Sequence, residues 1–143
     1  MPGLELHLER LMSASPDRVF RACVEAESLA AWWGPSGFTS TVEALDVNVA
    51  GGYRIAMQPP EGDVFHLRGN FRVVEPPHRL DFTFVWDPPD PDDRETLVSL
   101  TFAAAAEGTL VALDQGLFAT DARYELHRVG WTETLERLAR FLA

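Results

Sequence analysis

One stretch near the C-terminal end constrains the fold most: residues Thr120 to Leu142 have the periodicity of a single long amphipathic helix. At about 100° per residue, one stripe collects Tyr124, His127, Trp131, Leu135, Leu138 and Leu142. The charged side chains of Glu125, Glu133, Glu136 and Arg140 fall away from that stripe. A helix this apolar on one face does not stay exposed to water. We therefore expect it to pack on a larger apolar surface.

The residues at the two ends of this helix suit helix termini. Thr120 or Asp121 can accept hydrogen bonds from the first free N–H groups as the N-cap. Arg137 and Arg140 suit the partly negative C-terminal end of the helix dipole. Gly130 costs roughly 1 kcal/mol against alanine inside a helix. It either leaves room beside the tryptophan that follows, for a neighbouring backbone or a ligand, or serves ordinary close packing.

The beginning of the chain predicts one strand and two short helices. Apolar residues alternate with charged ones and a histidine from Leu4 toward Leu11, which is typical of a half-buried strand. Ser15 as N-cap and Pro16 at the first helical position begin a helix. Its apolar face carries Val19, Phe20, Cys23 and Val24. A second short helix is expected over Ser28 to Trp33, because the GPSG segment after it cannot continue a helix.

From Phe38 onward, β-branched and aromatic runs alternate with turn residues, and this pattern predicts strands. The candidates are Thr39 to Val47, Tyr53 to Met57, Val64 to Val74, Arg79 to Trp86, Thr96 to Phe102 and Thr109 to Gln115. The connections are short, and short connections favour an antiparallel meander. The acidic segment Asp87 to Glu95 lacks the spacing of an EF-hand loop, so we expect a solvated hairpin loop rather than a calcium site.

Strand parity predicts one apolar face and one polar face. The apolar set is Tyr53, Ile55, Met57, Phe65, Leu67, Phe71, Val73, Leu80, Phe82, Phe84, Trp86, Val98, Leu100, Phe102, Leu110 and Ala112. The set suited to solvent is Arg54, Arg68, Asn70, Arg72, Arg79, Asp81, Thr83, Ser99 and Thr101. The C-terminal helix must cover the apolar face. A curled sheet is wider than a helix of about 10 Å diameter, so we expect a cavity beside the helix.

Composition narrows the class of protein. With 143 residues and 46% hydrophobic residues, the chain suits one domain over residues 1–143. Cys23 is the only cysteine, which excludes an internal disulfide and a thiolate-rich zinc site. No apolar run approaches the ~20 residues of a membrane span, and the first ten residues lack the pattern of a signal peptide. We expect a cytoplasmic protein without a membrane contact.

The charge balance also argues against nucleic-acid partners and against catalysis by lysine. The formal net charge is −10, and every basic residue is an arginine. An acidic chain without a basic cluster disfavours nucleic-acid binding. The absence of lysine removes Schiff-base chemistry.

The order of segments resembles a known family. SPDRVFRA, LAAWWGPSGFT, GGYRIAM, GNFRVVEPPHRLDFTFVW, VSLTF, GTLVALDQGLF and HRVGWTETLERLARFL together look like the family named for homology to the activator of the ninety-kilodalton heat-shock ATPase. That family belongs to the START-like (SRPBCC) superfamily. The resemblance implies an α+β helix-grip (START-like, Bet v-like) fold. In this fold a curved antiparallel sheet of six to seven strands surrounds a long C-terminal helix, and two short helices follow the first strand.

The resemblance leaves function open, because the superfamily includes carriers of hydrophobic ligands, polyketide cyclases and proteins of unknown role. Our first hypothesis is a cavity that binds a small hydrophobic or aromatic molecule. The second is a cyclase or hydrolase that uses His127, Asp46 or Asp114 as acid or base. The third, a contact with a chaperone, rests on the family name alone. Monomer and homodimer stay equally open.

The candidate ligand-binding residues are mainly aromatic. They are Trp32, Trp33, Tyr53, Met57, Phe65, Leu67, Phe71, Phe82, Phe84, Trp86, Phe102, His127, Trp131 and Leu135. Of the adjacent Trp32 and Trp33, one could face the cavity mouth, although packing of both on the sheet is favoured. His127 is more often a satisfied core or rim histidine than a catalytic one. Asp46 and Asp114 share parity with inward residues, but the solvent-facing interpretation is favoured. We predict no metal and no cofactor.

Overall fold

The structure is a computed structural model, and it describes residues 4–143. The elements are β1 (Leu6–Met12), α1 (Pro16–Val24), α2 (Ala26–Trp32), β2 (Thr39–Leu45), β3 (Gly52–Gln58), β4 (Phe65–Glu75), β5 (Arg79–Asp87), β6 (Thr96–Ala105), β7 (Gly108–Gly116) and α3 (Asp121–Leu142). Every predicted helix and strand is present. The boundaries move by at most three residues, as for α2, which begins at Ala26 rather than Ser28.

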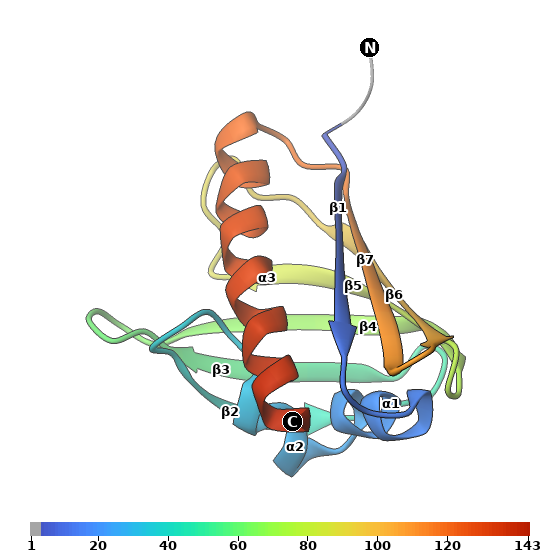
Figure 1. Cartoon of the computed structure of the whole chain (residues 1–143). Helices are drawn as coiled ribbons and strands as arrows, with labels where there is room; N and C mark the ends of the chain where they lie inside the picture. Colours follow the sequence, from blue (N-terminus) through green and yellow to red (C-terminus); the bar gives the residue numbers. More distant parts are fainter. Residues whose placement is uncertain (1–3) are drawn as a thin grey trace.

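All seven strands form one antiparallel sheet in the order β1-β7-β6-β5-β4-β3-β2. The sheet twists strongly, so that β1, β6 and β7 run along α3 while β3 and β4 run across it (Figure 1). The two short helices lie near the C-terminal end of α3 (Figure 1). This is the predicted α+β helix-grip arrangement, with the long helix held in the curve of the sheet.

Local residue types explain where the helices begin and end. The Ser15 hydroxyl accepts from the Arg18 N–H at the start of α1, and the Thr120 hydroxyl accepts from the Arg123 N–H at the start of α3. Thr120 is therefore the N-cap, and Asp121 lies in the first turn. Helix α2 ends because the next residue is extended and Gly34 has φ of +102°.

The buried stripe of α3 is the predicted one with one addition. His127, Trp131, Leu135, Leu138 and Leu142 are buried, and Thr134 joins them. Tyr124 is half-buried.

The end of α3 differs from the prediction at Arg137. Its Nη1 donates to the carbonyl oxygens of Trp33, Gly34 and Pro35 at 2.9–3.1 Å. Arg137 thus binds the carbonyls that follow α2 instead of stabilising its own helix end.

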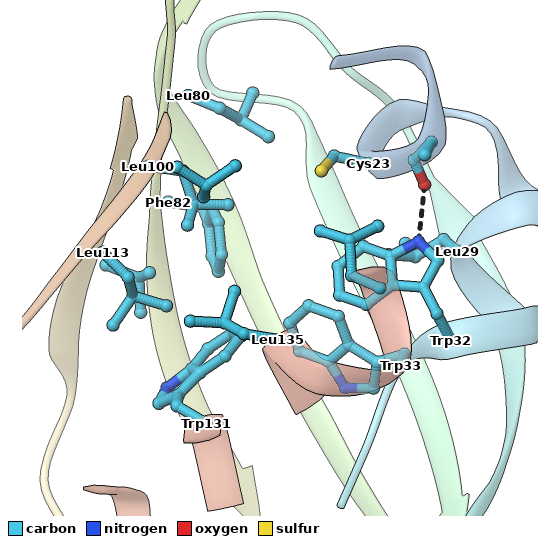
Figure 2. Close-up of a cluster of buried hydrophobic side chains, with 14 of the residues drawn as sticks. Cys23, Leu29, Trp32, Trp33, Leu80, Phe82, Leu100, Leu113, Trp131 and Leu135 are labelled. Carbon is cyan, nitrogen blue, oxygen red and sulfur yellow. Dashed lines mark hydrogen bonds between the residues drawn. The ribbon is translucent and has the colours of Figure 1, made fainter. Parts of the chain in front are cut away.

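The part of the core next to α1 and α2 is a cluster of buried side chains (Figure 2) that leaves only a small void of about 20 Å³. Trp32 is 2% exposed, and its indole N–H donates to the Ala22 carbonyl at 2.9 Å. Phe20 meets Phe102 edge to face, with ring centroids 5.7 Å apart. Cys23 is buried in the same cluster, as its position on the apolar face of α1 predicts.

Gly69 permits a close approach in the middle of the sheet. A Cβ at this position would lie 1.9 Å from the Thr83 carbonyl oxygen and 2.7 Å from Cε1 of Tyr53. Without that Cβ, the Tyr53 ring crosses β4 and its hydroxyl donates to the Thr83 carbonyl at 2.6 Å. The tyrosine therefore belongs to the packed core.

The predicted parity of β7 is wrong. Val111, Leu113 and Gln115 are buried, whereas Leu110 and Ala112 lie on the other face and are only half-buried. Both faces of this strand carry apolar residues, so alternation alone does not choose between them. Gln115 decides which face of β7 is buried, because its side-chain amide hydrogen-bonds with the buried His127 and Trp131.

Near β5, one further parity prediction is wrong, and so is the predicted solvent exposure of two outer-face residues. The register shifts between Phe71 and Val73, so Val74 faces Leu80 and Val73 faces Asp81. A bulge of this kind inverts which residue points inward. Asp81 and Thr83 were expected in solvent but are buried on the outer face. Asp81 pairs with Arg79 and accepts from the Ser99 hydroxyl.

Candidate functional site

A cavity of about 560 Å³ lies between α3 and the sheet, at the end away from the filled core. Its walls come from β3, β4 and β5, from the loop after α2, from the β5–β6 loop and from the first half of α3. The exposed side chains of Leu126 and Val129 lie at its mouth. The volume is within the range of small-molecule sites.

Six aromatic side chains line the cavity in a continuous chain, which we call the aromatic arc: Phe38, Phe65, Trp86, Phe84, Trp131 and Trp33. Successive ring centroids are 5.0–6.3 Å apart, and most pairs meet edge to face. Such contacts fix ring orientations beyond simple burial. The arc therefore forms a preformed apolar wall.

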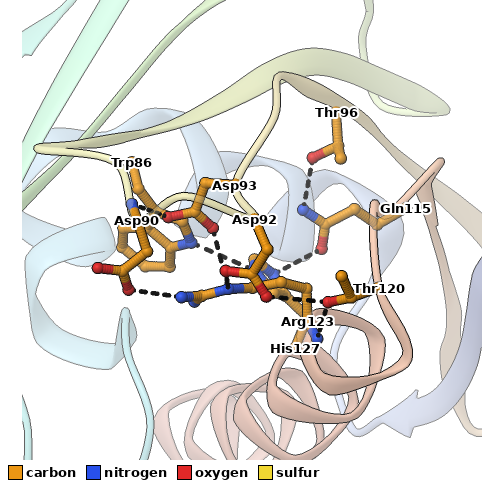
Figure 3. A network of polar contacts seen from close by, with 9 residues as sticks. All are labelled: Trp86, Asp90, Asp92, Asp93, Thr96, Gln115, Thr120, Arg123 and His127. Carbon is orange, nitrogen blue, oxygen red and sulfur yellow. Dashed lines mark hydrogen bonds and ion pairs between the residues drawn. The ribbon is translucent and has the colours of Figure 1, made fainter.

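A buried polar network holds two rings of the arc, those of Trp86 and Trp131; Figure 3 shows the part of it around Trp86, His127 and Gln115. The indole N–H of Trp86 donates to Nε2 of His127 at 3.2 Å. Nδ1 of His127 and the indole N–H of Trp131 both meet Oε1 of Gln115, at 3.1 and 2.8 Å. The Gln115 amide nitrogen donates to the Thr96 hydroxyl at 2.9 Å. Among residues 4–143, no buried side-chain nitrogen or oxygen lacks a partner.

This network assigns the tautomer of His127. An indole N–H can only donate, so Nε2 must accept and the proton must lie on Nδ1, facing the Gln115 oxygen. Burial, and after it the nearby Arg123 guanidinium, lowers the pKa of His127 to about 4. The imidazole is neutral at pH 7, and both ring nitrogens are already bonded within the protein.

One end of the cavity is the loop after α2, which α3 holds in place. The Glu133 carboxylate accepts from the Ser36 N–H at 3.1 Å, while Arg137, one turn later, binds the three preceding carbonyls. Gly130 lies opposite Pro35, where a Cβ would be 3.7 Å from the proline ring. That is an ordinary contact distance, so the glycine is part of the cavity wall rather than a site of forced close approach.

The other end is closed by residues 88–95, which we call the strap. Nε of Arg123 donates to Asp92 at 2.9 Å and lies 3.3 Å from an oxygen of Asp93, and its Nη2 pairs with Asp90 (Figure 3). The Thr120 hydroxyl also donates to Asp92, at 2.9 Å. These bonds, the one from Arg123 foremost, lower the pKa of Asp92. The strap is a hairpin loop between β5 and β6 with mostly exposed residues, as expected, but its binding to α3 through Arg123 was not predicted.

The structure divides the fourteen predicted ligand-binding residues into two groups. Those on the cavity wall are Trp33, Met57, Phe65, Phe84, Trp86, His127 and Trp131. Those packed in the core, away from this cavity, are Trp32, Tyr53, Leu67, Phe71, Phe82, Phe102 and Leu135. The strand residues of the second group share parity with those of the first, so parity does not separate the two groups.

The two aspartates considered as acids both face solvent. Asp46 is exposed beyond the end of β2. Asp114 lies on the outer face of β7, where Oδ1 is 2.7 Å from Nδ1 of His7. Neither carboxylate lines the cavity. The favoured, solvent-facing interpretation of both is confirmed.

Sequence reasoning missed the residues that close the cavity. Phe38, Pro88, Asp90, Asp93, Arg123 and Glu133 line it together with Thr134 and the mouth residues. Phe38 and Pro88 stand in turns, where periodicity gives no direction. The pairing of the strap with Arg123 joins residues about thirty positions apart, and a local pattern does not reveal it.

Within residues 4–143, no group of three or more His, Cys, Asp or Glu side chains is placed to hold a metal ion. None of the helices α1, α2 and α3 is long and apolar enough to cross a membrane.

The sequence profile of the family described as "Activator of Hsp90 ATPase homolog 1-like protein" matches residues 13–143. The chain belongs to this family. The match covers most of the described chain, from the end of β1 through α3, and therefore includes the whole cavity. No curated protein matches the chain significantly.

Solved structures agree with the family assignment. Protein CV1439 from Chromobacterium violaceum is 27% identical, has a TM-score of 0.85 and is matched over 96% of each chain. The AHSA1 protein from Silicibacter pomeroyi is 29% identical, has a TM-score of 0.80 and is matched over 95% of each chain. A protein from Rhodobacter sphaeroides is 26% identical with a TM-score of 0.82, over 99% of this chain and 95% of that one. This member of the activator-homologue family thus has the START-like helix-grip fold.

Proposed function

We propose that the protein binds a small, mostly apolar molecule in the cavity beside α3. The observation that carries the proposal is the aromatic arc, six rings on the wall of a space of about 560 Å³. Their orientations are set by contacts and hydrogen bonds inside the protein, so a ligand would enter a rigid site. Rigid, largely apolar clefts with few polar groups are the usual form of small-molecule sites. Family membership supports the proposal at the level of fold.

Acid–base catalysis is the second candidate, and one observation favours it: His127 lines the cavity and its pKa is displaced to about 4. The hydrogen bonds argue against it. A general base needs a free lone pair within reach of the substrate, and the Nε2 lone pair already accepts from Trp86. We therefore assign His127 a positioning role, in which it holds two indole rings through Trp86 and Gln115. A contact with a chaperone stays a prediction from the family name.

Titration with N-phenyl-1-naphthylamine, a neutral probe whose emission rises in apolar surroundings, tests the binding proposal. We expect saturable binding with a rise in melting temperature. Gly130→Met should weaken binding, because the new side chain would extend from the cavity wall toward Pro35 and occupy part of the space. Thr132→Met is the matched control. It adds the same side chain to the same helix at an exposed position outside the cavity.

The proposal fails if the wild-type protein shows no saturable binding. It also fails if Gly130→Met, shown by circular dichroism to be folded, binds the probe as tightly as Thr132→Met does.

A further inference from the structure

The charged groups on the cavity wall are unequal in number. Three carboxylates, those of Asp90, Asp93 and Glu133, line the cavity, against one guanidinium, that of Arg123. Asp92, just behind the wall, also binds Arg123. Ligands that enter therefore meet more negative than positive charge.

The single cation on the wall is already compensated. Arg123 donates to Asp90 and Asp92, and it lies 3.3 Å from a carboxylate oxygen of Asp93. Its side chain is only 16% exposed. To bind an anionic ligand group, the guanidinium would have to leave carboxylates that surround it. Arg123 therefore offers little attraction to an anion.

Glu133, at the opposite end, makes no ion pair among the described residues. One of its oxygens accepts from the Ser36 N–H. Arg137, one turn along α3, carries a positive charge in the same region, but its donors bind the backbone carbonyls of Trp33 and Gly34 and not the carboxylate. Glu133 therefore contributes a carboxylate without a direct cationic partner to the cavity wall.

The aromatic arc adds a second attraction of the same sign. The π face of an aromatic ring carries partial negative charge and attracts cations, most strongly for tryptophan. Three of the six rings in the arc are indoles, of Trp33, Trp86 and Trp131. A cationic group beside an apolar ring system would match both the rings and the carboxylates.

Resting on the proposed function, we infer that the cavity selects apolar ring molecules that carry a cationic group, such as a protonated amine, over the corresponding carboxylates. Like charges at short range repel, and opposite charges attract, by energies that correspond to about tenfold in affinity at a partly exposed site. Neutral analogues should bind with intermediate affinity.

Three naphthalene derivatives test this selectivity: 1-naphthylmethylamine, 1-naphthalenemethanol and 1-naphthoic acid. At pH 7.5 they are cationic, neutral and anionic on the same ring. We expect the amine to bind about tenfold or more tightly than the acid by isothermal titration calorimetry, with the alcohol between them. The difference should narrow in 0.5 M salt because the cavity opens to solvent.

Glu133→Gln separates this wall charge from the overall charge of the protein. The substitution should lower the ratio of amine to alcohol affinity about two- to fivefold. Glu136→Gln is the matched control, since it changes the net charge equally from a position on α3 outside the cavity. It should leave the ratio unchanged.

Each outcome supports or overturns the inference. Tighter binding of the amine, with the ratio lowered by Glu133→Gln alone, supports it. Equal or tighter binding of naphthoic acid, while the alcohol still binds, overturns the charge selectivity and leaves the binding proposal standing. An equal response of the ratio to both glutamine variants also overturns it. Failure of all three compounds to bind overturns both proposals.

Discussion

Mild acid should destabilise this protein through His127. The imidazole is neutral in the folded state with a pKa of about 4, against 6.5 for an unperturbed histidine. As the pH falls below 6.5, the unfolded state takes up a proton that the folded state refuses, so the free energy of unfolding decreases. The decrease continues until the pH reaches about 4 and then levels off.

The size of the effect follows from the two pKa values. At pH 5 the unfolded histidine is protonated and the folded one is still mainly neutral, so the penalty spans the interval from 6.5 to 5. At 1.36 kcal/mol per pH unit this is about 2 kcal/mol. The structural reason is first the burial of the imidazole and then the nearby Arg123 guanidinium; in addition, a protonated Nε2 can no longer accept from the Trp86 indole.

Urea unfolding followed by tryptophan fluorescence at pH 7.5 and pH 5 measures this term. His127→Gln keeps an acceptor and a donor but does not titrate. Its loss of unfolding free energy between the two pH values should be about 2 kcal/mol smaller than that of the wild type. Equal losses in the two proteins would refute the assignment of a buried, neutral His127.

His7 provides a control of opposite sign. It is about half exposed, and hydrogen bonds to Asp114 and then Glu9 raise its pKa. Because its pKa is higher in the folded than in the unfolded state, His7 stabilises the folded state at pH values below 6.5. This stabilisation is lost as the pH rises through the folded-state pKa. His7→Gln should therefore make the loss on acidification slightly larger, not smaller.

Two further substitutions and one thiol reaction test the strap, helix α3 and the core. Arg123→Gln should lower the free energy of unfolding by about 1–3 kcal/mol in urea, because it leaves the buried Asp93 carboxylate without its cationic partner. Arg128→Gln, which breaks an exposed pair on the same helix, should have a clearly smaller effect. Equal effects of the two substitutions would contradict the account of the strap. Gly130→Ala should raise the free energy of unfolding by about 0.5–1 kcal/mol, since alanine favours a helix and the new Cβ would lie 3.7 Å from the nearest atom, in Pro35. A decrease in the free energy of unfolding would mean that the position is more crowded than this distance indicates. Burial raises the pKa of Cys23 to about 12. The thiol should therefore react with Ellman's reagent only after the protein unfolds. Rapid reaction of the native protein would place the thiol outside the core.

Periodicity predicted the elements well because their faces differ strongly in polarity. On β3, Tyr53, Ile55 and Met57 alternate with polar or small residues and face inward as expected. Helix α3 has a single apolar stripe and packs along it. In both cases burying the other face would cost far more free energy, so the sequence pattern alone decides.

The failures occur where two arrangements have nearly equal apolar content or where distant residues decide. The two faces of β7 differ little, and Gln115 faces inward because His127 and Trp131, on another element, hydrogen-bond its oxygen. The bulge after Phe71 has no local signal. Strand parity also cannot tell cavity wall from filled core, since both are apolar. That distinction depends on how far along the sheet α1 and α2 reach.

The central claim is that the space between the aromatic arc and α3 admits a ligand. Intermolecular nuclear Overhauser effects between bound 1-naphthalenemethanol and assigned aromatic protons test it most directly. The account predicts contacts with Trp33, Phe84 and Trp131, which line the cavity, and none with Trp32, which is packed in the core. Contacts confined to exposed side chains elsewhere, or none to these three rings at saturation, would contradict it.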